Sequence, residues 1–234
     1  MANYILVHGA WHGGWSWYKV VAGLERLGHT VHAPDLPGHG HAGGEQRMAN
    51  YVSALVDLIG TLDGPVNLVG HSMGGMIITG VAEAVPDRIA NLVFLAAFLA
   101  ESGQNCLQAG AEDKQTTLGS AVILVPGADV SVADDAAGKR TFYGECSDED
   151  RVLARMLRVP QHKEPISTPV HWTPGRFGRV PRRYIECLKD RAIGIDHQRA
   201  MQAKFDCPVM ASLDTDHSPF FSDPDALVSV LAAL

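Results

Sequence analysis

The chain has 234 residues, 46% of them hydrophobic and 19% charged, which is typical of a soluble globular protein. This length favours one α/β domain with an insertion over two separate domains. The net charge is −7 and no stripe rich in lysine or arginine is present, so nucleic acid is not expected as a partner.

The N-terminus and the cysteines bear on where in the cell the protein is expected. The chain begins MANYILVHGAW, without the basic segment and long apolar stretch of a signal peptide. No run of about 18 apolar residues is present to span a bilayer, and no membrane partner is expected. Cys106, Cys146, Cys187 and Cys207 are scattered without metal-ligand spacing, which favours reduced thiols. We therefore expect a cytoplasmic protein.

The first hundred residues alternate short apolar runs with helical patterns. Such alternation indicates parallel strands joined by right-handed helical crossovers. Because the strands are unbroken apolar runs, both faces of the sheet should be covered. In chain order the pattern predicts strand Tyr4–Val7, a helix over 17–27, strand Thr30–Ala33, a helix over 54–62, strand Val66–Val69, helix Met73–Ala84 and strand Leu92–Ala96.

The rhythm breaks between 100 and 181, where the clearest helical pattern is Glu149–Leu157. The alternation then resumes with strand Tyr184–Cys187, a helix around Asp196–Lys204, strand Val209–Leu213 and helix Pro224–Leu234. We therefore predict a core of residues 1–99 and 182–234, with about six mostly parallel strands flanked by helices. Residues 100–181, the insert, are predicted to form a cap or lid over an active site, the alternative being a decorative insertion.

Residues 70–74 read GHSMG, a G-x-S-x-G motif between a predicted strand and a predicted helix. In that context the turn holds Ser72 in a strained conformation with its side chain exposed above the sheet. The flanking glycines are required because a Cβ there would collide with the neighbouring strand or helix. The helix N-terminus also favours negative charge developing nearby. The alternative is a serine that only caps the helix.

A serine nucleophile needs a base at neutral pH. Of eleven histidines, only His217 lies directly after a late strand and before the last helix, the alternative role being that of a surface-loop histidine. Asp190 follows strand Tyr184–Cys187 and gives the chain order Ser…Asp…His, and Asp214 is the alternative acid.

An oxyanion hole requires two backbone N–H groups. Met73, directly after the serine, should supply one, and Ala10, in the loop after the first strand, the other. His8 and His71 flank this region and are predicted to have backbone or packing roles. For Trp15 and Trp17, we favour core packing over substrate contact.

Several segments together resemble the α/β-hydrolase superfamily, and more narrowly the branch of plant methylesterases, including the salicylate-binding esterase, and plant hydroxynitrile lyases. They are HGAWHGGWSW, DLPGHG, VGHSMGG, FGRVPRRYIECLKDRAI and DHSPFFSDP. The similarity covers nearly the whole chain and loosens between about 105 and 140. It implies an α/β-hydrolase fold with Ser72 as nucleophile, Asp190 as acid, His217 as base, and Ala10 and Met73 as oxyanion donors.

Two positions separate the activities of this branch. The lyases have a threonine after the first-strand histidine and a lysine after the catalytic histidine. Here these positions are Gly9 and Ser218, which favours hydrolysis and leaves room at Gly9 for an ester carbonyl. Together with Trp11 they are the pocket candidates.

We therefore expect a serine carboxylic ester hydrolase that acts on small to medium, hydrophobic or aromatic esters, with methyl esters as one option. No metal or organic cofactor is expected. Hydrolysis of an amide, carbamate or lactone by the same residues remains open, as do lyase activity and a non-enzymatic small-molecule receptor. Related esterases often form dimers, so a homodimer is also open.

Overall fold

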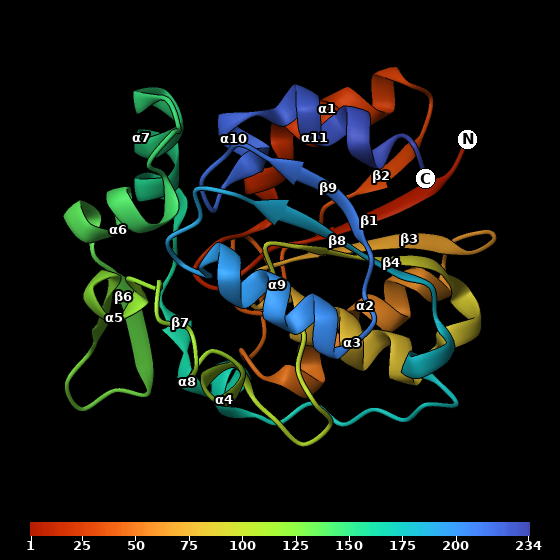
Figure 1. The fold of residues 1–234 in the computed structure, drawn as a ribbon, viewed down its shortest axis with the longest axis horizontal. Helices are drawn as coiled ribbons and strands as arrows, with labels where there is room; N and C mark the ends of the chain where they lie inside the picture. Colours follow the sequence, from red (N-terminus) through yellow and green to blue (C-terminus); the bar gives the residue numbers. More distant parts are fainter.

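A computed structural model describes residues 1–234. Its centre is one sheet of six strands in the order β2-β1-β3-β4-β8-β9, and every neighbouring pair is parallel (Figure 1). This confirms the predicted α/β architecture and the number of strands. The strands are β1 (Asn3–Val7), β2 (Thr30–His32), β3 (Val66–His71), β4 (Ile89–Leu95), β8 (Arg182–Cys187) and β9 (Val209–Leu213).

Helices cover both faces of this sheet, as unbroken apolar strands require. The first and last long helices lie together on one face, and three others lie on the opposite face (Figure 1). The first group is α1 (Tyr18–Arg26) and α11 (Pro224–Leu231), and the second is α2 (Met48–Gly60), α3 (Gly74–Ala84) and α9 (Ile195–Lys204). Short 3₁₀ helices lie at η1 (Gly14–Trp17), η2 (Pro86–Arg88) and η3 (Phe177–Arg179), and the short helix α10 (Pro219–Ser222) precedes α11.

Helix α2 begins earlier than its apolar pattern predicts. Met48 and Tyr51 extend the buried face that Leu55 and Ile59 continue. Tyr51 is buried because its hydroxyl has a partner, the Nε2 atom of His39 at 2.9 Å. A tyrosine whose hydroxyl is hydrogen-bonded can occupy a core position, which the sequence pattern alone does not reveal.

The insert lies between β4 and β8, beside the large sheet in Figure 1. It contains a small antiparallel sheet that the sequence pattern did not predict, in the order β5-β6-β7. The predicted helix over 149–157 is present as α7. The elements are α4 (Cys106–Ala109), α5 (Leu118–Ala121), β5 (Val122–Leu124), β6 (Val130–Ala133), α6 (Asp135–Phe142), α7 (Asp148–Leu157), β7 (Gln161–His162) and α8 (Lys163–Ser167).

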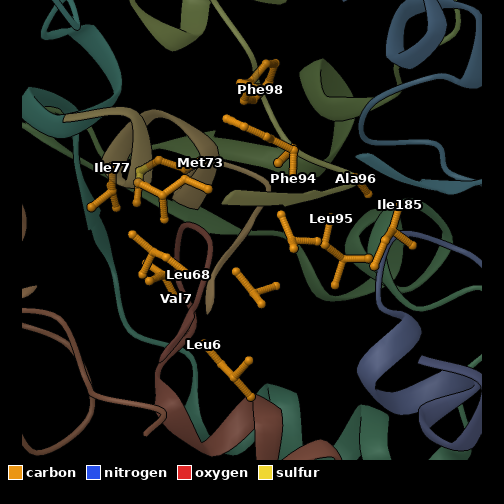
Figure 2. Close-up of a cluster of buried hydrophobic side chains, with 14 of the residues drawn as sticks. Leu6, Val7, Leu68, Met73, Ile77, Phe94, Leu95, Ala96, Phe98 and Ile185 are labelled. Carbon is orange, nitrogen blue, oxygen red and sulfur yellow. The ribbon is translucent and has the colours of Figure 1, made fainter. Parts of the chain in front are cut away.

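The hydrophobic core reaches the turn that carries the G-x-S-x-G motif. Figure 2 shows Met73 and Ile77 gathered with Leu68 of β3 and with apolar side chains of β1, β4 and β8. All four cysteines are buried and unpaired. None of the helices combines the length and hydropathy that a bilayer crossing needs.

Candidate active site

Ser72 lies where β3 ends and α3 begins, on a sharp turn. Its φ is +55°, in the left-handed region that costs a residue with a Cβ about 1 kcal/mol or more. Three backbone hydrogen bonds hold it there: its N–H donates to the Leu95 carbonyl at 3.3 Å, and its carbonyl accepts from Gly75 and Phe98, both at 3.1 Å. Ser72 remains partly exposed, so a ligand can reach its side chain.

The glycines around Ser72 are needed for steric reasons, and residues 70–75 are called the nucleophile turn below. A Cβ at Gly70 would lie 2.6 Å from the Gly74 carbonyl oxygen, and one at Gly74 would lie 2.9 Å from the Val7 oxygen. A Cβ at Gly75 would overlap the carbonyl oxygen of Phe98. Since backbone atoms cannot move aside cheaply, only glycine fits these positions.

His217 lies on the loop between β9 and α10 and is joined to Asp190. Its Nδ1 atom lies 2.7 Å from Asp190 Oδ2, and both side chains are almost completely buried. The backbone N–H groups of Ala192 and Ile193 donate to the other carboxylate oxygen at 2.7 and 3.0 Å, and the Gln198 amide donates to Oδ2 at 3.3 Å. The carboxylate is therefore fixed in the direction of the imidazole.

A second histidine ties the His217 loop to the nucleophile turn. His71, the residue before Ser72, donates from Nε2 to the His217 carbonyl at 2.8 Å, and the two ring centroids lie 4.5 Å apart. Burial lowers the pKa of His71 well below its usual value, so the ring is neutral. The structure thus places His217 against His71, the residue before Ser72, and contains no hydrogen bond between the Ser72 hydroxyl and the imidazole.

The loop after β1, residues 8–12, is called the oxyanion loop below. It lies directly against the nucleophile turn, because a Cβ at Gly9 would be 2.9 Å from the Ser72 Cβ. Neither the Ala10 N–H nor the Met73 N–H donates a hydrogen bond within the protein. Both groups are therefore free to donate to a ligand atom.

Aromatic side chains connect this region to the insert. The Trp11 ring lies 5.7 Å from the ring of Phe142, and Phe142 lies 5.9 Å from the ring of His217. Trp11 is itself buried, and its indole N–H donates to the Ser131 carbonyl of β6 at 3.1 Å. These contacts give the site an apolar wall that the insert helps to build.

The other residues considered from the sequence have different surroundings. Asp214 is mostly exposed and pairs with Lys189 at 3.1 Å. The His217 Nδ1 atom is bonded to Asp190 instead. Trp17 is fully buried against Phe220 at 5.2 Å, which is core packing. Ser218 is also fully buried, and its hydroxyl has no hydrogen-bond partner.

Sequence reasoning missed Gln198, Phe142 and Tyr143. Gln198 supports Asp190, while Phe142 and Tyr143 of the insert contact the rings of His217 and His12 respectively. Gln198 and Phe142 lie in helices and Tyr143 directly follows one, so their only local signal was a polar or aromatic position in or beside a helix. Their partners lie far away in the chain, so no short motif could have identified them.

A parallel sheet with a serine at a strained strand-to-helix turn, and a buried histidine–aspartate pair after later strands, is the arrangement of an α/β hydrolase. The model of the Alpha/beta hydrolase family matches residues 4–230, and the chain belongs to that family.

Named relatives agree with the resemblance to the plant methylesterase branch. A pyrethroid hydrolase of Sphingobium wenxiniae is 33% identical over 99% of this chain and 87% of its own length. Methylesterase 7 of Arabidopsis thaliana is 33% identical over 98% of this chain and 94% of its own. The crystal structure of a pyrethroid hydrolase from Sphingobium faniae matches with a TM-score of 0.86 at 30% identity, covering 99% of this chain and 96% of that one. The chain is an enzyme, a hydrolase of the carboxylesterase type.

Proposed function

We propose that this enzyme hydrolyses carboxylic esters with a small to medium, hydrophobic or aromatic acyl group, using Ser72, His217 and Asp190 as a catalytic triad. The observation that carries the proposal is the buried 2.7 Å contact between His217 Nδ1 and Asp190 Oδ2. The loop that carries His217 is held by His71, the residue directly before Ser72, which donates to the His217 carbonyl. This contact fixes the imidazole tautomer that leaves Nε2 free to accept a proton.

In the proposed reaction, His217 Nε2 takes the proton of Ser72 as Oγ attacks the ester carbonyl carbon. The oxygen of the tetrahedral intermediate accepts hydrogen bonds from the N–H groups of Ala10 and Met73. The C–O bond to the alcohol then breaks, and His217 donates its proton to the leaving oxygen. Water, deprotonated by His217, attacks the acyl-enzyme. The bond between the acyl carbon and Oγ breaks, His217 returns the proton to Oγ, and the acid and free Ser72 are released. Asp190 stabilises the imidazolium in both halves.

The surroundings of the site support an apolar acyl group. Trp11 and Phe142 contribute aromatic surface beside His217. The names of the relatives, a pyrethroid hydrolase and a methylesterase, support an ester, with methyl esters as one option. Gly9 and Ser218 stand where the lyases of this branch have threonine and lysine, which supports hydrolysis over cyanohydrin cleavage.

A kinetic screen of methyl, aryl and p-nitrophenyl esters, carbamates and lactones tests the proposal. We expect ester turnover by the native enzyme and a fall in kcat of about 10⁴-fold or more in Ser72→Ala. Ser120→Ala is the matched control, because this exposed serine lies in the insert and bonds only the Thr117 carbonyl. Near-normal turnover by Ser72→Ala would refute the triad. Preferred turnover of carbamates or lactones would correct the substrate class.

A fluorophosphonate probe tests nucleophilicity separately from turnover. We expect stoichiometric labelling at Ser72, abolished in Ser72→Ala. Labelling without turnover of any ester would instead indicate a small-molecule receptor. The cytoplasmic location and a homodimer stay predictions, which cell fractionation and light scattering check.

A further inference from the structure

Three histidines hold the oxyanion loop in the same way. His8 Nδ1 lies 2.8 Å from the Gly9 carbonyl oxygen, His12 Nδ1 lies 2.7 Å from that of Ala10, and His39 Nδ1 lies 2.7 Å from that of His12. A carbonyl oxygen can only accept, so each Nδ1 atom carries the proton and donates it. Three of the carbonyls around Ala10 are therefore fixed in direction by imidazoles.

The other ring nitrogen of each histidine accepts a hydrogen bond. The Leu36 N–H donates to His8 Nε2 at 3.1 Å, the Tyr51 hydroxyl to His39 Nε2 at 2.9 Å, and the Tyr143 hydroxyl to His12 Nε2 at 2.6 Å. Burial lowers the pKa of His12 to about 3 and that of His39 to about 4, and it lowers the pKa of His8 well below its usual value. All three rings are therefore neutral and have one defined tautomer.

Two of these three chains reach the insert, because the Tyr51 hydroxyl also accepts from the Gln161 amide of β7 at 3.4 Å, but only in the His12 chain does an insert residue bond the loop histidine directly. Leu36 and Tyr51 belong to the core, whereas Tyr143 follows α6 of the insert and is 3% exposed. The next residue of the loop, Trp11, is also held by the insert: its carbonyl accepts from the Val159 N–H at 3.0 Å. Trp11 has a φ of +63°, a strained conformation that must be held by its surroundings.

These contacts determine where the Ala10 N–H points. The peptide plane before Ala10 is fixed at the Gly9 oxygen by His8, and the plane after it is fixed at the Ala10 oxygen by His12. The Ala10 N–H belongs to the first plane. If the second hydrogen bond weakens, the strained Trp11 can relax and turn the second plane, and the Ala10 Cα that joins the two planes then moves the N–H from its working position. A donor that is preorganised in direction is what stabilises an oxyanion.

We infer that Tyr143, acting through His12, is a positioning residue for the oxyanion hole, so that the hole has its working geometry only while the insert is docked on the core. The inference rests on the proposed function, since it assigns Ala10 as an oxyanion donor. It adds a residue of the insert, far from Ser72 in the chain, to the parts that determine the rate.

Tyr143→Phe removes the hydroxyl and leaves the ring, and it is tested with p-nitrophenyl butyrate. Complete loss of an oxyanion donor costs about 10²–10³-fold in kcat, so a misdirected donor should cost less, about tenfold. The loss should fall on kcat rather than KM, because the interaction forms only in the transition state.

Two ketones separate positioning from general damage. Trifluoromethyl propyl ketone forms a tetrahedral adduct with a serine and places an oxyanion in the hole, whereas 2-pentanone binds without an adduct. We expect the inhibition constant of the first to rise by the same factor as kcat falls, about tenfold, with that of the second unchanged. Equal weakening of both inhibitors would indicate a merely structural role and would overturn the inference.

Tyr4→Phe is the matched control. Tyr4 is also buried, and its hydroxyl donates to the Leu231 carbonyl at 2.8 Å, far from the site. We expect Tyr4→Phe to lose about as much free energy of unfolding as Tyr143→Phe, with kcat unchanged. If Tyr143→Phe behaves like Tyr4→Phe in kcat and in ketone inhibition, the inference is wrong.

A double mutant shows whether Tyr143 acts through His12. In His12→Asn the amide nitrogen takes the place of Nδ1 and can still donate to the Ala10 carbonyl, but nothing accepts from Tyr143. We expect His12→Asn to keep more activity than His12→Ala, and Tyr143→Phe to add no further loss in the His12→Asn background. Additive losses would contradict the chain. Failure of the proposed function is visible separately, as normal turnover in Ser72→Ala.

Discussion

The nucleophile turn and the oxyanion loop meet at one site but are held in shape by different means. The turn at 70–75 depends on glycines, which have no side chain, because backbone atoms approach where a Cβ would collide. The loop at 8–12 depends on side chains that are present, above all the imidazoles of His8, His12 and His39.

This difference separates a part of the site that stands alone from a part that depends on distant residues. The turn needs only core segments, namely the sheet, α3 and Phe98 after β4, so its geometry follows from the core. The loop also needs Tyr143 and Val159 of the insert. A change in how the insert docks can therefore alter the loop while Ser72 keeps its conformation.

The largest effect is expected at Asp190, which holds His217 by one side-chain hydrogen bond, as the histidines hold the loop. Asp190→Asn should lower kcat by about 10⁴-fold with the fold intact, because an amide favours the wrong imidazole tautomer. Steady-state kinetics and circular dichroism measure this. Asp214→Asn, at an exposed carboxylate, should leave kcat unchanged. A large loss of kcat in Asp214→Asn instead would show that Asp190 is not the triad acid.

Next in size is the loss of fold stability when the nucleophile turn receives a methyl group. Gly75→Ala should reduce the free energy of unfolding by more than about 3 kcal/mol, because the Cβ overlaps the Phe98 carbonyl. Urea denaturation measures it. Gly60→Ala, at a helical glycine with open space around it, should instead stabilise by up to about 1 kcal/mol. Equal midpoints for the two variants would remove the steric basis of the comparison.

A methyl group at Gly9 tests the place where turn and loop touch. Its Cβ would lie 2.9 Å from that of Ser72 and 3.2 Å from His71 Nδ1, so the loop must shift. Gly9→Ala should therefore lower kcat/KM by about 10²-fold, as for the loss of one oxyanion donor. Gly43→Ala, with open space around it, is the control. An unchanged kcat/KM in Gly9→Ala would show that the contact does not set the loop.

The smallest effect is the loss of stability in acid, about 2 kcal/mol for His39 between pH 7 and pH 5. His39 has its pKa lowered to about 4 by burial, so the folded protein stays unprotonated there below pH 6.5 while the unfolded chain takes up a proton. Stability should fall as the pH is lowered from 6.5 toward 4. His39→Gln should make this fall less steep by one proton, as measured by urea denaturation at pH 7 and pH 5. His41→Gln, at an exposed histidine of the same segment, should keep the native slope.

Much of the fold could be predicted because its signals are local. Unbroken apolar runs indicated each strand of the large sheet, and the G-x-S-x-G motif indicated the turn, since glycines and a neighbouring strand and helix are all that it needs. The small sheet of the insert was not predicted, because its apolar run Val122–Leu124 is only three residues long, Val130–Ala133 mixes polar with apolar residues, and Gln161–His162 is polar.

The candidate site divides in the same way. Ser72, His217 and Asp190 could be chosen from a motif and from their order after strands. The support of the oxyanion loop could not, because Tyr143 lies 131 positions from His12 and nothing near either residue indicates the contact. A neutral buried histidine also looks like any other histidine in a sequence.

The burial of every native cysteine has a practical consequence for observing the insert. Burial raises the pKa of Cys106 and of Cys207 to about 12, so these thiols resist alkylation in the folded enzyme. Met156 on α7 is 73% exposed. A Met156→Cys variant would thus accept a single fluorophore, whose emission reports in real time whether the insert lifts during turnover.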